Sequence, residues 1–453
     1  MDAKFAAKNG SGRRSRAGPQ AAAALIGLAA LEAVFVAMRR LGDLKLHVVE
    51  TIALGLAAGV LYLGILYAFE RSRETPATFW LILAGALLFR LTLLPLEPSL
   101  STDIHRYRWD GHVQQGGWNP YDLAPNDPRL TALRDAHWRE MPGLELPTIY
   151  PPLAELVYRL AWRVLPGPVG FKLPFLLADL LVVCLLAVWI RTTGGRNFQL
   201  AIYAWNPLVV VEFAASGHND ALAMAGVVAA IVIIRRHEKE STPLARGAAS
   251  TLALTAGALA KAFPTVLLPL WLRRTGWRNA VWAAALAGAC AWPFRTAWPR
   301  IPHILTYYES RWQNNNASLY SLIAWFSGSR ELAAGLGVGV VAGLAVWAAV
   351  RRMDVARAAY LLIGAILMLA PNGYSWYFTW IVPLLSFLPS LGSRTAWLLL
   401  TVLEFLSYNV LIDYQATGRW QFDPFLEWLT YGPFYALLVW QALRGTGRLR
   451  DAG

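Results

Sequence analysis

The chain has 453 residues, of which 56% are hydrophobic and only 15% are charged, and it carries a net charge of +13. Soluble domains carry about 25% charged residues, and here apolar stretches of roughly 17–25 residues recur, so the composition indicates a polytopic helical membrane protein and excludes a soluble one. The basic residues lie in short loops between apolar segments, which is a membrane topology signal and does not indicate a nucleic-acid partner.

Apolar segments of spanning length occur from one end of the chain to the other. Residues 1–18 are basic and rich in Gly and Ser, so we expect a disordered cytoplasmic tail, followed by a single multispan domain over 19–453. The segment 247–272 is too short for two full crossings and predicts a pair of short, broken helices around Lys261. The expected fold is all-α, with about 12–14 spans. The other spans are expected near 20–40, 48–69, 78–96, 171–190, 199–215, 220–235, 277–294, 331–350, 357–371, 375–390, 396–412 and 425–443.

The basic loops set the expected orientation of these spans. Arginine and lysine gather in 235–239, 273–278, 351–353 and 444–450. The positive-inside rule places such loops in the cytoplasm. Arg39, Arg40 and Lys45 would then lie outside, but the four later loops carry more basic residues, so we base the orientation on them. Three spans precede residue 97, so 97–148 is expected to be a long external loop.

A dense polar stretch, STDIHRYRWDGHVQQGGWNPYD, follows the third apolar segment at 101–122. Ser101 and Thr102 are good helix N-caps, so a helix is expected to begin there. The Asn119-Pro120 pair and the residues after it are turn formers. The stretch is therefore predicted to be a short helix followed by a loop.

Asp103 would lie in the first turn of this helix. The helix dipole stabilises a carboxylate at that place, and Arg106 on the same face would reinforce the effect. Tyr107 and Asp110 share that face. An ionised carboxylate at a membrane surface can accept a proton from a substrate hydroxyl. The alternative is that Asp103 only caps the helix and pairs with Arg106, and the local sequence leaves both readings open.

The two histidines of the stretch do not predict a metal site. His105 lies about 200° round the helix from Asp103, so His105 and His112 face elsewhere. A single helix cannot gather its carboxylates and imidazoles around one ion, which argues against zinc. We therefore predict no histidine-ligated metal here.

The following segment, YPPLAELVYRLAWRVLP, begins with prolines that suit a helix N-terminus. Its apolar residues, such as Leu156 and Leu160, repeat on one side, whereas Glu155, Arg159 and Arg163 repeat at four-residue spacing on another. This pattern is typical of an amphipathic helix at the membrane interface and not of a span.

Polar side chains also interrupt the later apolar segments. His218 and Asp220 lie in EFAASGHNDALA, Lys261 is isolated in an apolar run, and Arg311 and Tyr377 fall on the expected external side. Burial of such groups beside lipid is costly, so they usually face a cavity. The alternatives are a plain interhelical turn at His218 and a snorkelling side chain at Lys261.

Five motifs occur in order over about residues 100–380: TDIHRYRWDGHVQQGGWNPY, YPPLAEL, SGHNDALA, KAFP and PNGYSWY. This ordered set resembles the GT-C class of integral membrane glycosyltransferases. The likeness is to bacterial and archaeal polyprenol-phosphate-mannose-dependent mannosyltransferases, and more distantly to the first mannosyltransferase of GPI-anchor synthesis. His105 departs from the motif, in which an aromatic or aliphatic residue is expected.

The resemblance implies a GT-C-like fold, with interfacial helices and a long external loop whose essential acidic residue matches Asp103. It implies an inverting glycosyltransferase that takes a sugar, expected to be mannose, from a polyprenyl-phosphate donor. The acceptor would be a glycan or a lipid-linked glycan, and Asp103 would be the catalytic base. We expect the donor phosphate and substrates to contact Arg106, Tyr107, Asp110, His218, Asn219, Asp220, Lys261, Arg311 and Tyr377.

A secondary transporter or lipid flippase is the alternative function, because broken helices and intramembrane charges fit it equally well. The external loop with Asp103 and Asp110 favours the enzyme. A divalent cation (Mg²⁺ or Mn²⁺) held by Asp103, Asp110 or Asp220 is compatible with the sequence, but nothing in the spacing demands it. The expected location is the plasma (inner) membrane, with the active site outside and membrane lipids, but no nucleic acid, as further partners.

Overall fold

The computed structural model describes residues 19–235, 244–311, 318–389 and 392–450. All regular elements within these residues are helical, so the expected all-α fold is confirmed. The expected tail, 1–18, lies outside the described residues.

Six helical segments in the described residues are long and apolar enough to cross a membrane. A seventh candidate is a pair of helical segments that bend by 46° between Ala204 and Pro207. The six are α1 (Pro19–Arg40), α2 (Val48–Arg71), α3 (Pro76–Leu93), α6 with α7 (Pro168–Phe171 and Leu173–Thr193), α16 (Arg330–Val350), and a run of α19 (Arg394–Leu403), η8 (Glu404–Asn409) and α20 (Val410–Thr417). The bent pair is α8 (Asn197–Ala204) with α9 (Pro207–Val210) and η3 (Val211–Ser216).

The remaining expected spans correspond to other helices, most of them shorter or broken, so the total of 12–14 stays a prediction. They are α10 (Asp220–Arg235), α11 (Leu244–Ala260), α13 (Ala280–Ala291), α17 (Val355–Leu369), η7 (Ser375–Trp380) with α18 (Val382–Phe387), and α21 (Pro424–Arg450). Two further helices, α14 (Ile301–Arg311) and α15 (Leu319–Ser327), lie between α13 and α16. A short 3₁₀ segment joins α13 to α14.

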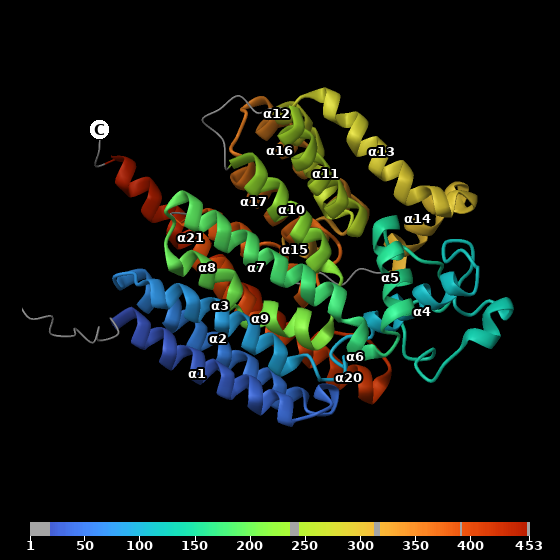
Figure 1. The fold of residues 1–453 in the computed structure, drawn as a ribbon, viewed down its shortest axis with the longest axis horizontal. Helices are drawn as coiled ribbons and strands as arrows, with labels where there is room; N and C mark the ends of the chain where they lie inside the picture. Colours follow the sequence, from blue (N-terminus) through green and yellow to red (C-terminus); the bar gives the residue numbers. More distant parts are fainter. Residues whose placement is uncertain (1–18, 236–243, 312–317, 390–391, 451–453) are drawn as a thin grey trace, which may run out of the picture.

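The predicted external loop lies at one end of the helix bundle, with α4 (Asp103–Gln115) and α5 (Pro152–Val164) packed against each other (Figure 1). Gly111 makes this contact close, because a Cβ atom there would lie 2.5 Å from the carbonyl oxygen of Tyr158. Helix α4 begins at Asp103, as the sequence predicts. The capping hydroxyl is that of Ser101, which accepts from the Asp103 N–H at 3.2 Å, and not that of Thr102.

The prediction that Glu155 lies on a polar, exposed face of α5 is wrong. That side chain is fully buried, where it accepts hydrogen bonds from Thr148 Oγ1 at 2.7 Å and Gln114 Nε2 at 2.8 Å. Burial raises the pKa of Glu155 well above its ordinary value. Leu160 is instead 63% exposed, which fits a helix with its apolar side toward lipid.

Two glycines bring α10 and α11 unusually close together. A Cβ atom on Gly226 would lie 2.6 Å from both the Ala253 carbonyl oxygen and the Gly257 nitrogen. Helix α11 ends at Ala260 and is followed by a turn, by η4 (Phe263–Leu267) and by α12 (Leu268–Thr275). The predicted broken helices around Lys261 are therefore confirmed, and the glycine contact places the break beside the start of α10.

A buried ion pair ties α3 to α7 inside the bundle. Arg90 pairs with Asp179, and both side chains are fully buried. The Arg90 guanidinium also donates to the carbonyl oxygens of Ala86 at 3.0 Å and Ala204 at 2.9 Å, and Tyr203 Oη donates to Asp179 at 2.7 Å. Hydrogen bonds on all sides are what a buried pair needs to offset its desolvation.

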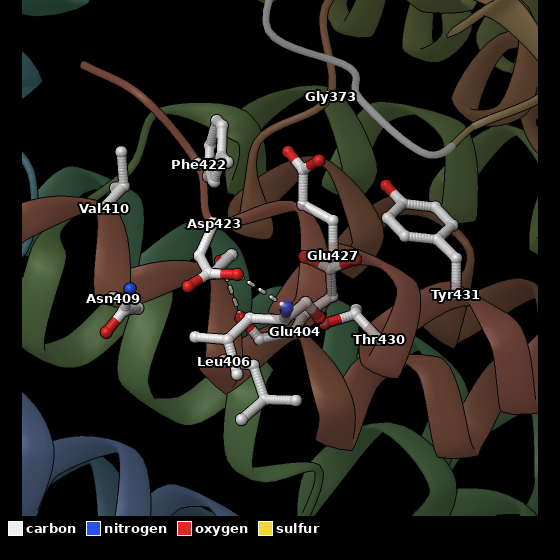
Figure 2. A pocket seen from close by; sticks show the side chains of 12 residues that line it. Gly373, Glu404, Leu406, Asn409, Val410, Phe422, Asp423, Glu427, Thr430 and Tyr431 are labelled. Carbon is white, nitrogen blue, oxygen red and sulfur yellow. Dashed lines mark hydrogen bonds between the residues drawn. The ribbon is translucent and has the colours of Figure 1, made fainter. Parts of the chain in front are cut away.

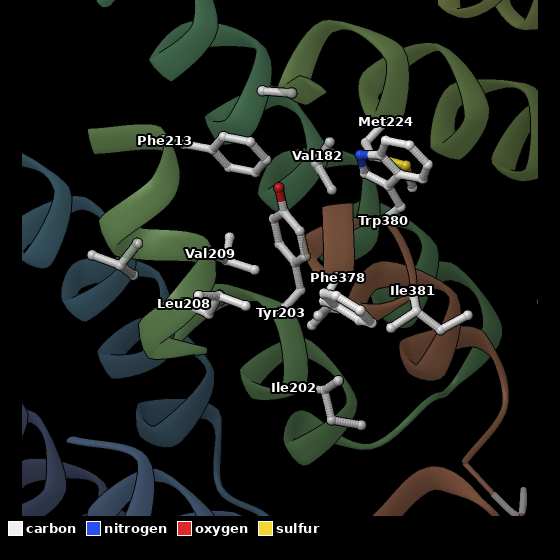
Figure 3. Packing of buried hydrophobic residues seen from close by; sticks show 14 of the residues in the cluster. Val182, Ile202, Tyr203, Leu208, Val209, Phe213, Met224, Phe378, Trp380 and Ile381 are labelled. Atoms are coloured by element: carbon white, nitrogen blue, oxygen red, sulfur yellow. The ribbon is translucent and has the colours of Figure 1, made fainter. Parts of the chain in front are cut away.

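The apolar core continues around Tyr203, whose ring packs between helices far apart in the sequence. Figure 3 shows it between Leu208 and Val209 on one side and Phe378 on the other. Trp380 lies at the edge of the same cluster. The core thus reaches the segment that carries the PNGYSWY motif and holds it against α8 and α9.

Candidate active site

Asp103 is the carboxylate at the centre of the candidate site. Its Oδ2 atom is 3.5 Å from Tyr107 Oη, which donates to it, and 3.9 Å from His218 Nδ1. The side chain is 21% exposed. Burial, with a smaller contribution from the charge of Asp220, raises the pKa of Asp103 to about 6, although the positive charge of Lys261 acts to lower it. A carboxyl group with a pKa this close to neutrality is suited to accept and release a proton.

Arg106 and Asp110 do not line this site with Asp103. Arg106 Nε donates to both Asp110 oxygens at 3.1 Å, and its other nitrogens donate to the carbonyl oxygens of Gly143 and Leu146, each at 3.0 Å. Both side chains are buried in the loop. The pairing of Asp103 with Arg106 is therefore wrong, and Arg106 and Asp110 instead hold the 97–148 loop together. Of the expected neighbours on this face, Tyr107 is the one that contacts Asp103.

His218 comes from a turn between η3 and α10. Gly217 adopts a left-handed conformation (φ +74°), and His218 N donates to the Glu212 carbonyl at 3.1 Å. This confirms the predicted turn before Asp220. The His218 ring is 1% exposed and stacks on Trp376, with ring centroids 4.0 Å apart. The histidine is thus held rigidly with one nitrogen toward Asp103.

The other nitrogen of His218 faces Glu212, which the sequence pattern did not single out. Glu212 Oε2 is 3.4 Å from His218 Nε2, and Oε1 accepts from Ser375 Oγ and Tyr408 Oη, both at 2.6 Å. Glu212 is fully buried. It is a charge in an apolar segment, so the argument that marked Lys261 could also have found it. His218 consequently lies between two carboxylates.

Lys261 is paired in the structure and is not an uncompensated charge. Its Nζ atom donates to Asp220 Oδ2 at 2.9 Å and to Asn219 Oδ1 at 3.3 Å, and it lies 5.1 Å from the centroid of the Tyr377 ring. Asp220 Oδ1 also accepts from Trp380 Nε1 at 2.7 Å. An ammonium group has three N–H donors, so two of them are committed to protein oxygens here.

Asn219 links this pair to α4 and α5. Its Nδ2 donates to Tyr158 Oη at 2.6 Å, and its Oδ1 is 3.4 Å from Tyr107 Oη. Tyr107 has a single hydroxyl proton, which it shares between Asn219 and Asp103. The polar groups therefore form one continuous network from α4 to the turn at Lys261.

Two aromatic stacks include residues of the network. Tyr374 stacks on Trp376 at 4.5 Å, and Trp376 stacks on His218. In the second stack Phe263 stacks on Trp380, which stacks on Tyr377. The two stacks meet edge to face at Tyr377, and such packing restricts how the rings can move.

Most of the expected site residues come together, although they are far apart in the sequence. Arg311 ends α14, and its side chain lies outside the described part of the structure. The group that the structure assembles is Asp103, Tyr107, His218, Asn219, Asp220, Lys261 and Tyr377, with Glu212, Tyr158, Trp376 and Trp380 added.

A cavity of about 30 Å³ lies near this group but is separate from it. Figure 2 shows its lining, with Glu404, Asp423 and Glu427 around it and Gly373 of the PNGYSWY motif at its edge. Neither Asp103 nor Lys261 lines it, so we do not place the chemistry there.

The carboxylates considered as cation ligands do not converge. Asp110 is taken by Arg106, and Asp220 by Lys261. Within the described ranges, three other metal-ligating side chains do converge, those of His105, His137 and Glu140. The geometry therefore does not favour Mg²⁺ or Mn²⁺ at Asp103.

Comparison with protein-family models gives one decisive match. The model of the MptA_B family, described as an alpha-(1->6)-mannopyranosyltransferase N-terminal domain, matches residues 18–275. The chain belongs to this mannosyltransferase family. The matched region contains Asp103, His218 and Lys261 but not Tyr377. No curated protein and no solved structure matches the chain.

This membership makes the protein a membrane glycosyltransferase with a sugar donor and a glycan acceptor. It decides against the secondary transporter or flippase that the sequence left as an alternative. The mannosyltransferase therefore needs a base for the acceptor and a stabilised leaving group, which directs attention to Asp103 and Lys261.

Proposed function

We propose that this mannosyltransferase moves mannose from a polyprenyl-phosphate donor to the 6-hydroxyl of a glycan or glycolipid acceptor, with inversion, on the external face of the plasma membrane. The supporting observation is the position of Asp103: a partly exposed carboxylate with a pKa of about 6, in one network with the ammonium group of Lys261. A donor anchored in the membrane by its polyprenyl chain fits an enzyme that is itself embedded there.

In the proposed reaction Asp103 takes the proton of the acceptor hydroxyl as its oxygen attacks C1 of mannose. The new C1–O bond forms while the bond from C1 to the phosphate oxygen breaks, and polyprenyl phosphate leaves with the electron pair. The remaining N–H of Lys261 is available to that phosphate. Tyr107 Oη donates to the Asp103 carboxylate, and His218 Nδ1 lies 3.9 Å from it.

The stereochemistry supplies a direct test. An α product formed by a single displacement requires a β-linked donor, because each displacement inverts C1. The purified protein should turn over β-linked polyprenyl-phosphate mannose, and neither the α-linked isomer nor a nucleotide-linked mannose. Transfer from the α-linked lipid with retention, or from the nucleotide sugar, would contradict the proposal.

The pH profile should follow the ionisation of Asp103. The base must be deprotonated, and its pKa is raised to about 6, so kcat/KM should be near its plateau at pH 7 and fall about tenfold per pH unit well below pH 6. Steady-state rates between pH 4.5 and 8 would measure this, with melting curves at each pH to exclude unfolding. A flat profile down to pH 5 would argue against Asp103 as the base.

The proposed topology has its own prediction. A single cysteine at Asn126, in a chain whose native cysteines are replaced, should react with an impermeant thiol reagent on intact cells. A cysteine at Glu240, in the predicted cytoplasmic loop, should react only after the cells are opened. The basic-loop pattern is the physical reason. The reverse labelling would place the Asp103 side of the protein in the cytoplasm.

A further inference from the structure

Three metal-ligating side chains converge on the face of α4 that points away from Asp103. His105 Nε2 is 3.7 Å from Glu140 Oε2, and His137 Nδ1 is 3.9 Å from the same oxygen. One ligand atom from each residue lies within 4.8 Å of the others. Reasoning from α4 alone predicted no metal, and it could not anticipate that the loop returns His137 and Glu140 to this face.

Each of the two imidazole rings has a buried nitrogen without a hydrogen-bond partner in the described part of the chain. His105 is 7% exposed, and neither its Nδ1 nor that of His137 has a hydrogen-bond partner among the described residues. The rings stack with centroids 4.5 Å apart and an angle of 7°. Unpaired buried polar atoms are costly and call for an explanation. An ion beside Glu140 would provide one for His137 Nδ1, whereas His105 faces Glu140 with its other nitrogen, Nε2.

We propose that His105, His137 and Glu140 bind a zinc ion, or a similar transition-metal dication, that stabilises the external loop. Two imidazole nitrogens with one carboxylate oxygen is an established zinc ligand set that leaves a fourth position for water. Hard cations such as Mg²⁺ and Ca²⁺ prefer oxygen ligands, so this set selects against them.

The distances are close to what such an ion needs. Ligand bonds of about 2.0–2.2 Å in a tetrahedron separate the ligand atoms by roughly 3.3–3.6 Å. The two separations from Glu140 therefore have to shorten by a few tenths of an ångström. One of the two stacked rings also has to turn, because nitrogen lone pairs in parallel ring planes do not point at one ion. Glu140 and His137 can move, since their side chains are 45% and 36% exposed, and this exposure also gives the ion a path from solvent.

Neighbouring side chains form the wall of the site and do not compete as ligands. A small cavity there is also lined by His112 and Asp135. His112 stacks on Trp162, and Asp135 accepts from Arg108 at 3.5 Å. The inferred ion would connect α4, two residues after Asp103, to the segment around 137–140, so its role is to brace the loop and not to touch the donor.

The test uses the full-length detergent-purified protein without a polyhistidine tag, stripped with a chelator and then reloaded with zinc chloride. Wild type should retain about one zinc per chain after desalting, measured by elemental mass spectrometry, and its Tm should rise with zinc concentration. Glu140→Gln and His137→Ala should lose the bound zinc and the Tm increase while their metal-free Tm stays near that of wild type.

The matched control is His47→Ala. His47 forms an exposed pair with Glu50 at the same 3.7 Å separation but without a third ligand, so this variant should bind zinc like wild type. Less than about a tenth of an equivalent in loaded wild type would overturn the proposal. So would zinc retention in Glu140→Gln and His137→Ala equal to that of wild type.

Discussion

Asp103→Asn should lower kcat at least ~100-fold, the low end of what loss of a general base costs. The amide has the shape of the carboxylate but cannot take a proton. Tyr107 can still donate to the side-chain oxygen, so the fold should be retained. Transfer of mannose from the β-linked donor, measured in single-turnover conditions, would report the chemical step separately from product release.

A carboxylate of the same loop provides the control for this variant. Asp127 accepts from the exposed Arg129 and is remote from the network, so Asp127→Asn should transfer at nearly the wild-type rate. The melting temperature of Asp103→Asn should stay near that of wild type. Near-normal transfer by a folded Asp103→Asn would remove Asp103 from the mechanism.

Lys261→Met should lower thermal stability and also weaken binding of the donor lipid. Asp220 is fully buried, and Lys261 is its charged partner at 2.9 Å. Removing one member of a buried pair typically costs about 3–5 kcal/mol, because the other charge is stranded. The comparison is of melting temperatures with and without polyprenyl phosphate for wild type and variant.

The double variant Lys261→Met/Asp220→Asn separates the two effects. It removes the stranded charge, and the oxygen of the introduced amide can still accept from Trp380, so much of the lost stability should return. The melting shift caused by polyprenyl phosphate should remain small, since the ammonium is still missing. A shift as large as that of wild type in the double variant would reject the phosphate role and leave Lys261 only a structural one.

Local signals in the sequence predicted the elements of the site but not their partners. The N-cap residues before Asp103 and the proline after Lys261 act over a few residues, so the start of α4 and the break after α11 were predictable. Arg106 lies three residues from Asp103 and four from Asp110, and either pair is allowed on a helix. The carbonyls of Gly143 and Leu146, about 40 residues away, decide between them.

Local sequence patterns could not predict the partners of Lys261 and His218 either. An isolated charge in an apolar run indicates that a partner or cavity exists, but not which residue supplies it. Asp220 faces Lys261 only because α10 and α11 pack side by side. Glu212 faces His218 because a π-helical turn shifts the backbone before Gly217. Such turns carry no clear sequence signature and often occur at functional sites.

In the proposed mechanism, the glycine contact between α10 and α11 makes the catalytic rate sensitive to a position that touches no substrate. Asp220 begins α10 and Lys261 follows α11, and the spacing of the two helices at Gly226 and Gly257 sets how far apart these charges lie. One added methyl group at Gly226 must push α11 outward, because backbone atoms of Ala253 and Gly257 occupy that space. A random screen for inactive but membrane-inserted variants should therefore recover Gly226→Ala and Gly226→Ser, although Gly226 follows Asp220 by more than one turn of α10.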